Sequence, residues 1–164
     1  MPLHELLGGE RITILTDTED RDAVIDAAAR LLAGDAGAGA GPGAAAIGHS
    51  LRTREQLAST AIGHGVAIPH GRIAGLAESR GAFLRLAPAV DFGAVDGEPV
   101  DLVLAMAVPE HSVQEHLQQL AELVEQFADA GFRERLRGAS DVAGLRQCLL
   151  RQPARPPSNP STVA

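Results

Sequence analysis

Aromatic side chains are scarce in this sequence of 164 residues, and lysine is absent. Four phenylalanines, with no tyrosine and no tryptophan, leave Ala, Val, Leu and Ile to fill the core, and they argue against ligand binding by aromatic stacking. All 14 basic residues are arginines. The lack of lysine excludes mechanisms that need an amine side chain, such as a Schiff base or a Walker-type phosphate clamp.

The sequence also lacks an excess of positive charge and any long hydrophobic run. Its net charge of −7 argues against nucleic-acid binding, which needs a basic face to neutralise phosphates. No cationic leader with an apolar stretch opens the chain, and no apolar run approaches the roughly 20 residues that span a bilayer. We therefore expect a soluble, cytoplasmic protein without membrane insertion.

The length of the chain fits one domain with a substantial core, here predicted over residues 1–151. Residues 34–43 are almost entirely Gly and Ala, which predicts a flexible surface loop inside that domain. Residues 152–164 are rich in proline and are predicted to form a disordered tail. The single cysteine, Cys148, excludes an internal disulfide, and its helical surroundings favour a role in core packing.

Hydrophobic periodicity predicts a packed α/β domain. Apolar runs indicate strands over residues 12–16, 66–68, 81–86 and 100–108. The last run is apolar enough for a central strand that is covered on both faces. Helical spacing indicates helices over residues 19–33, 44–57, 113–129, 131–137 and 140–150. Asp96-Gly97 is a turn signal, and it predicts a hairpin from residues 90–95 into the last strand.

The ends and faces of two helices are also predicted. Thr18 or Asp20 can cap the helix over residues 19–33. Ser112 and Glu115 match a capping box at the start of the helix over residues 113–129. In that helix a stripe with alternating spacings of four and three is predicted to face the core: Val113, Leu117, Leu120, Val124 and Phe127.

His70 is the first candidate for chemistry, because of its place beside a predicted strand. Gly63 and Gly65 supply a turn that tolerates positive φ, residues 66–68 form the short strand, and Pro69 lacks the N–H that would continue it. His70 is then expected just past a strand end, where a rigid scaffold commonly carries a site. A hydrogen-bonded structural histidine is the alternative interpretation.

Arg54 and His116 are candidate partners of His70. Arg54 follows Leu51 by three positions and leaves its helix beside the buried stripe, so it can reach a neighbouring strand end. His116 borders the predicted buried face near the N-terminus of its helix, where free N–H groups and the dipole favour anions. These side chains can form a phosphate site, with one imidazole as nucleophile, the other as hydrogen-bond donor and the guanidinium offsetting charge.

The other histidines support weaker hypotheses. His64, between two glycines, is interpreted as a residue that lines the site or as a structural spacer, whereas His4, His49 and His111 are interpreted as surface or capping residues. Zinc is disfavoured, because His111 and His116 lie five positions apart, about 140° around a helix. We expect neither a metal nor a cofactor.

A serine-hydrolase site is not supported. The run Gly48-His49-Ser50 could begin a nucleophile elbow, but that turn needs glycine at position 52, where this chain has Arg52.

The run from Arg54 to Gly71, which contains Ile62-Gly63 and Val66-Ala67-Ile68-Pro69-His70-Gly71, resembles a family signature. It is similar to the enzyme IIA domains of the fructose and mannitol type in the bacterial phosphoenolpyruvate-dependent phosphotransferase system. Two later runs resemble the nitrogen-regulatory branch of that family: residues 96–102, which read Asp-Gly-Glu-Pro-Val-Asp-Leu, and residues 116–120, which read His-Leu-Gln-Gln-Leu. The resemblance extends from about residue 5 to 150.

Two departures from the family pattern occur. Ala61 stands where the family usually has glycine, and the Gly/Ala stretch over residues 34–43 is looser than usual. The first is a mild steric change near the site, and the second can alter the surface that a partner reads. Neither departure removes a reacting group.

The resemblance implies a single domain with a mixed central β-sheet and helices on both faces. It also implies that His70 is the phosphorylated histidine, that His116 stabilises the phosphoryl group and that Arg54 orients or neutralises it. The implied activity is that of a phosphocarrier, which accepts phosphate on Nε2 of His70 from HPr or its nitrogen-branch relative and acts as a nitrogen or metabolic regulator on a protein target.

Two alternative functions stay open. A fructose- or mannitol-specific IIA component would pass the phosphate to a IIB domain. A non-enzymatic regulatory module would keep the fold and control a partner by contact alone. The presence of His70, His116 and Arg54 together argues against the second alternative.

Overall fold

The computed structural model describes residues 1–34 and 42–151, which form a six-stranded sheet with helices on both faces. The strands follow the order β1-β5-β6-β3-β2, and β4 also pairs with β6. Their bounds are β1 (Ile12–Leu15), β2 (Ala61–Gly63), β3 (Val66–Ala67), β4 (His70–Ile73), β5 (Arg80–Val90) and β6 (Val100–Pro109). The pairs β1·β5, β3·β6 and β4·β6 are parallel, whereas β5·β6 and β2·β3 are antiparallel. The predicted mixed sheet is confirmed.

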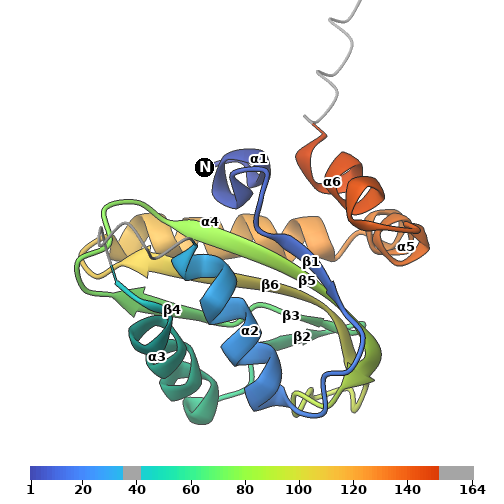
Figure 1. The fold of residues 1–164 in the computed structure, drawn as a ribbon, viewed down its shortest axis with the longest axis horizontal. Helices are drawn as coiled ribbons and strands as arrows, with labels where there is room; N and C mark the ends of the chain where they lie inside the picture. Colours follow the sequence, from blue (N-terminus) through green and yellow to red (C-terminus); the bar gives the residue numbers. More distant parts are fainter. Residues whose placement is uncertain (35–41, 152–164) are drawn as a thin grey trace, which may run out of the picture.

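Helices cover the two faces of the sheet in separate layers (Figure 1). The helices are α1 (Leu3–Leu7), α2 (Arg21–Ala33), α3 (Ala44–Leu57), α4 (Val113–Phe127), α5 (Ala130–Gly138) and α6 (Val142–Leu150). Apolar side chains of α2 and α3 pack in one core, and those of α1, α4, α5 and α6 pack in the other. All the predicted helices are confirmed to within about two residues at either end. The short α1 was not predicted.

The central strand β6 is buried along almost its whole length, as its apolar sequence predicts. The hairpin around Asp96-Gly97 is also confirmed, because β5 and β6 are antiparallel and residues 91–99 join them. The first arm of that hairpin was predicted too late in the sequence. It is β5, which runs to Val90 through a register shift, and residues 91–95 are irregular.

The predicted buried face of α4 is correct only in part, because Phe127 is buried and Leu120 packs against the core. Val113, Leu117 and Val124 are exposed, and the residues that α4 buries are His116, Gln119, Leu123 and Phe127. Apolar residues recur at helical spacing on both arcs, so periodicity alone does not select the face that meets the sheet. His116 therefore lies on the buried face itself rather than at its border.

The two predicted caps have different outcomes. Asp20 caps α2, with its carboxylate accepting a hydrogen bond from the Ala23 N–H at 2.8 Å. The capping box at α4 is wrong, because the Ser112 side chain makes no capping bond. Ser112 has φ −103° and ψ 58°, which is not the extended conformation that a capping side chain needs.

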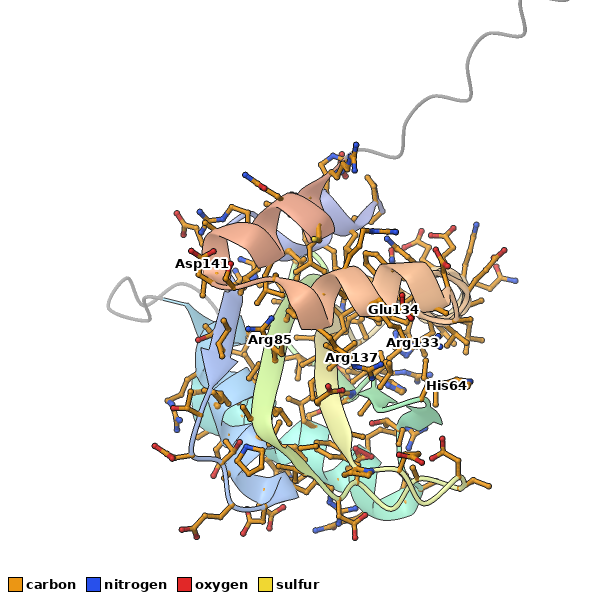
Figure 2. All side chains as sticks on the ribbon, turned by 90° about the vertical axis from the view of Figure 1, so that its right-hand side faces the viewer. His64, Arg85, Arg133, Glu134, Arg137 and Asp141 are labelled. Atoms are coloured by element: carbon orange, nitrogen blue, oxygen red, sulfur yellow. The ribbon has the colours of Figure 1, made fainter. Side chains whose placement is uncertain are left out.

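Arginines fasten α5 to the ends of the strands. Arg85 of β5 donates hydrogen bonds to the carbonyls of Leu136 and Ala139, which lie at the C-terminal end of α5. Arg137 pairs with Asp101 of β6 and donates to the His64 carbonyl. Figure 2 shows Arg85 and Arg137 between the helix and the strands. The Arg85 guanidinium thus satisfies carbonyls that the end of α5 leaves without a partner.

Two predictions concern residues that are not described. The Gly/Ala loop over residues 34–43 falls mostly on residues 35–41, and the tail over residues 152–164 falls on residues 152–164, all of which lie outside the described ranges. Within the described ranges, no helix combines the length and the apolar character needed to cross a bilayer.

Candidate functional site

His70 lies beside β6, on the side where the two short strands β3 and β4 pair with it one after the other. β3 pairs with β6 through Val66 and Leu102, and β4 pairs with it through His70 and Met106. Pro69 between them cannot donate to the ladder, but its carbonyl accepts a hydrogen bond from the Met106 N–H at 2.8 Å. The prediction that His70 follows a strand end is therefore correct for β3, but His70 also begins β4, a strand that was not predicted.

The His70 ring is held by the backbone. Its Nδ1 lies 2.7 Å from the carbonyl oxygen of Ile68. A carbonyl can only accept, so Nδ1 carries the hydrogen and Nε2 of the neutral ring has a free lone pair. Burial lowers the pKa of His70 below its usual value of 6.5; the Ile68 hydrogen bond opposes this shift, and the charge of Arg54 adds to it. At neutral pH the ring is thus uncharged, with a fixed tautomer.

His116 faces His70 from the first turns of α4. The two ring centroids are 5.2 Å apart, and the ring planes are tilted by 48°. His116 is only 7% exposed, and among the described residues its Nδ1 has no hydrogen-bond partner. Burial, with the positive charges of His70, Arg72 and Arg54, lowers the pKa of His116 to about 4. A neutral donor and an unpaired polar atom thus lie beside the candidate nucleophile.

Arg54 reaches the same site from the last turn of α3. Its positive charge contributes to the lowered pKa of both His70 and His116. One of its Nη atoms donates to the Ala58 carbonyl at 2.8 Å, which leaves the other nitrogens free to meet an anion. The structure thus brings together the three side chains that the sequence singled out.

Gly71 allows α3 to approach the site closely. A Cβ atom on residue 71 would overlap Oγ of Ser50, and it would lie 3.1 Å from the Ser50 Cβ. Ser50 also donates a hydrogen bond to the Arg72 carbonyl at 3.0 Å. The glycine after His70 therefore fixes the distance between β4 and the helix that carries Arg54.

The sequence model of one family, described as "Phosphoenolpyruvate-dependent sugar phosphotransferase system, EIIA 2", matches residues 5–152. The chain belongs to this family. EIIA domains are phosphotransfer carriers, so membership places the chain in that general class.

Similar proteins of the EIIA family include nitrogen regulatory proteins. One from Bradyrhizobium diazoefficiens is 38% identical over 109 residues, which are 66% of this chain and 71% of that protein. One from Pseudomonas aeruginosa is 41% identical over 104 residues, which are 63% of this chain and 68% of that protein. The crystal structure of the nitrogen regulatory protein IIA-Ntr from Neisseria meningitidis matches with a TM-score of 0.81 at 35% identity, covering 90% of this chain and 98% of that one. The resemblance to the nitrogen-regulatory members is confirmed.

Arg72 lies on the same strand as His70 and was not predicted as a candidate site residue. It follows His70 by two positions on β4, so the two side chains lie on the same face of the strand. Its charge contributes to the low pKa of His116, and its side chain is exposed. The signal in the sequence was the alternation of polar His70 and Arg72 with Gly71 and Ile73, which indicates a strand. It was missed because Pro69 was interpreted as the end of the strand.

The other histidines lie apart from the His70–His116 pair in their contacts. His64 has φ 57° in the β2–β3 turn, where its N–H donates to Asp96 and its carbonyl accepts from Arg137, as expected for a structural spacer. His49 and His111 are exposed, and His4 is half-buried on α1. Within residues 1–34 and 42–151, no group of three or more His, Cys, Asp or Glu side chains is arranged to hold a metal ion.

The low pKa of His116 predicts a pH-dependent stability. The folded state binds fewer protons than the unfolded state between pH 6.5 and about 4, so the free energy of unfolding rises with pH in that window. The contribution of neutral His116 to the free energy of unfolding is complete above pH 6.5 and is lost as the pH falls toward 4. At 1.36 kcal/mol per pKa unit, this contribution is at most about 3 kcal/mol. Urea denaturation at several pH values measures it. His116→Gln should flatten the dependence, and an equally steep dependence in this variant would contradict the prediction.

Proposed function

We propose that this EIIA protein accepts a phosphoryl group on Nε2 of His70 from the phosphohistidine of HPr or of a nitrogen-branch HPr-like carrier. In this proposal His116 donates a hydrogen bond to the phosphoryl oxygens, and Arg54 neutralises part of their charge. The phosphorylation state then controls a regulatory protein partner. The single observation that carries the proposal is the bond from His70 Nδ1 to the Ile68 carbonyl, which leaves Nε2 of a neutral ring as the free, nucleophilic nitrogen.

The chemistry is a transfer between two imidazoles. The Nε2 lone pair of His70 attacks the phosphorus, a new N–P bond forms, and the bond to the donor imidazole breaks with its electron pair leaving on the donor nitrogen. Catalysis of phosphoryl transfer depends mainly on positioning of the reactants and on stabilisation of charge. A fixed neutral tautomer, a neutral N–H donor at 5.2 Å between ring centroids and a nearby guanidinium satisfy both needs.

The surface around the site suits a protein donor. Leu57, three residues after Arg54, is 79% exposed, and Leu117, next to His116, is 58% exposed. Val113, one helical turn before His116, is 42% exposed. Exposed apolar side chains beside a charged centre are typical of a protein-binding surface. This favours a macromolecular donor and recipient over a free small-molecule phosphate donor.

Phosphate transfer from phosphoenolpyruvate through enzyme I and HPr tests the proposal. One added phosphate by intact mass, labile in acid and stable in alkali, is the expected result. No transfer from either HPr or a nitrogen-branch carrier would overturn it and would favour a module that acts by contact alone. Transfer onward to a IIB domain, measured in the same assay, would favour the sugar-specific alternative that the family description includes.

A further inference from the structure

Glu55 is a buried carboxylate next in sequence to Arg54, and the proposed reaction does not use it. It is 3% exposed, in the last turn of α3. The ion pairs in the described part of the chain join Arg52 to Asp26 and Arg137 to Asp101, and neither involves Glu55. Removing a carboxylate from water without a cationic partner costs several kcal/mol. A specific set of hydrogen bonds must therefore offset that cost.

Both oxygens of Glu55 bind one residue, Thr60. Oε2 accepts a hydrogen bond from the Thr60 N–H at 2.6 Å, and Oε1 accepts one from the Thr60 hydroxyl at 2.6 Å. Thr60 is itself only 6% exposed. The two short bonds fix both the position and the orientation of this residue at the start of the β2–β3 hairpin.

The chain of hydrogen bonds continues from Thr60 to His70. The Thr60 carbonyl accepts from the Ile68 N–H at 3.1 Å, and the Ile68 carbonyl accepts from His70 Nδ1 at 2.7 Å. The carboxylate of Glu55 thus holds Thr60, Thr60 holds Ile68, and Ile68 holds the imidazole.

The same carboxylate steadies the second site residue. Residues 58–60 join α3 to β2, and Arg54 donates to the carbonyl of Ala58 at 2.8 Å. Ser59 Oγ donates to the Phe92 carbonyl at 2.5 Å. Because Glu55 holds this link at Thr60, it helps to fix the backbone that binds Arg54 as well as the backbone that binds His70.

We propose that Glu55 is a positioning residue for phosphoryl transfer, which sets the Nδ1–H tautomer and the orientation of His70 through Thr60 and Ile68. This inference rests on the proposed function, because it assigns a role in that reaction. Its structural part is that the His70 tautomer depends on Glu55, and this part can be measured without any phosphate donor.

The test compares Glu55→Ala with Glu55→Gln. Glutamine keeps one oxygen for the Thr60 N–H, and its amide can donate to the Thr60 hydroxyl, which accepts when rotated. We expect Glu55→Ala to slow single-turnover transfer roughly 10- to 100-fold and Glu55→Gln to stay within about threefold of the unsubstituted protein. In long-range ¹H–¹⁵N spectra, Glu55→Ala should show part of His70 with the hydrogen on Nε2, and Glu55→Gln should not.

Asp141→Ala is the matched control. The Asp141 carboxylate also accepts a backbone N–H, that of Gly144 at 2.8 Å, but it caps α6. This variant should lose stability without any change in the His70 tautomer or in the transfer rate. If Glu55→Ala does not fold, Thr60→Val takes its place, because it removes the hydroxyl bond to Glu55 and keeps the backbone N–H.

The possible outcomes separate the inference from the function on which it rests. An unchanged tautomer in Glu55→Ala overturns the inference, even if transfer becomes slower. Equal slowing in Glu55→Ala and Glu55→Gln overturns it as well, because geometry would then not be what the carboxylate supplies. If the unsubstituted protein accepts no phosphate, the proposed function fails, and the tautomer spectra still decide whether Glu55 positions His70.

Discussion

His70→Ala should fold and accept no phosphate, with a loss of transfer rate greater than about 10³-fold, which corresponds to more than about 4 kcal/mol in the barrier. The expected loss is this large because the substitution removes the bond-forming nitrogen itself. His70 is half-buried at the first residue of β4, so alanine leaves no large internal cavity. Circular dichroism checks the fold, and intact mass after incubation with the phosphorylated donor checks the loss.

His116→Ala is the informative comparison for the nucleophile. In the proposed reaction His116 supplies one hydrogen bond to the developing charge, and removing one such donor typically costs about 10²- to 10³-fold. Reduced but measurable transfer is therefore expected. Equal loss of transfer in the two variants would contradict the assignment of His70 as nucleophile, because either ring of a pair 5.2 Å apart is within reach of the same phosphorus.

The elements of the fold could be predicted where one physical rule dominated. Apart from Asp101 near its start, strand β6 is apolar because both of its faces are covered, and such a run is typical of a central strand. Helix α3 begins after Gly43 and ends at Leu57 as predicted, because the glycine-rich sequence stops just before Ala44 and apolar residues recur at helical spacing from there. Asp20 could be identified as a cap because few residue types accept a bond from a helix N-terminus.

Prediction failed where two local rules competed. Pro69 cannot continue a ladder, and it was interpreted as the end of the sheet edge. Its carbonyl instead accepts from Met106, so pairing resumes one residue later and His70 begins β4. In α4, apolar residues with helical spacing lie on two sides of the helix, and the side that carries Leu123 and Phe127 packs in the core. The pairing of β4 and the buried side of α4 both depend on contacts with segments distant in the sequence, which the local sequence does not specify.

The side chains of the proposed site could be singled out from the sequence, but the residues that support them could not. His70, His116 and Arg54 are polar residues next to apolar segments, which is a visible signal. Glu55 was overlooked because a charged residue is expected at the surface. Its position was nevertheless readable: Ile47, Leu51 and Glu55 recur every four residues, so all three lie on the buried face of α3.

The scarcity of aromatic residues makes Phe127 unusually important for stability. Its ring is 1% exposed and lies 6.4 Å from that of Phe83 on β5 and 5.2 Å from that of Phe132 on α5, so three of the four phenylalanines meet where α4, α5 and the sheet join. Phe127→Ala should lower the free energy of unfolding by about 3–5 kcal/mol, because it removes a buried ring from a packed core and leaves a cavity. The free energy of unfolding of a small domain is only about 5–15 kcal/mol, so the substitution should remove a large part of the stability. Urea denaturation with an unchanged m-value measures the loss.

Leu117→Ala, on the same helix but 58% exposed, should change stability by less than about 0.5 kcal/mol. Similar losses in the two variants would mean that α4 packs on the face first predicted from its sequence, with Leu117 toward the sheet.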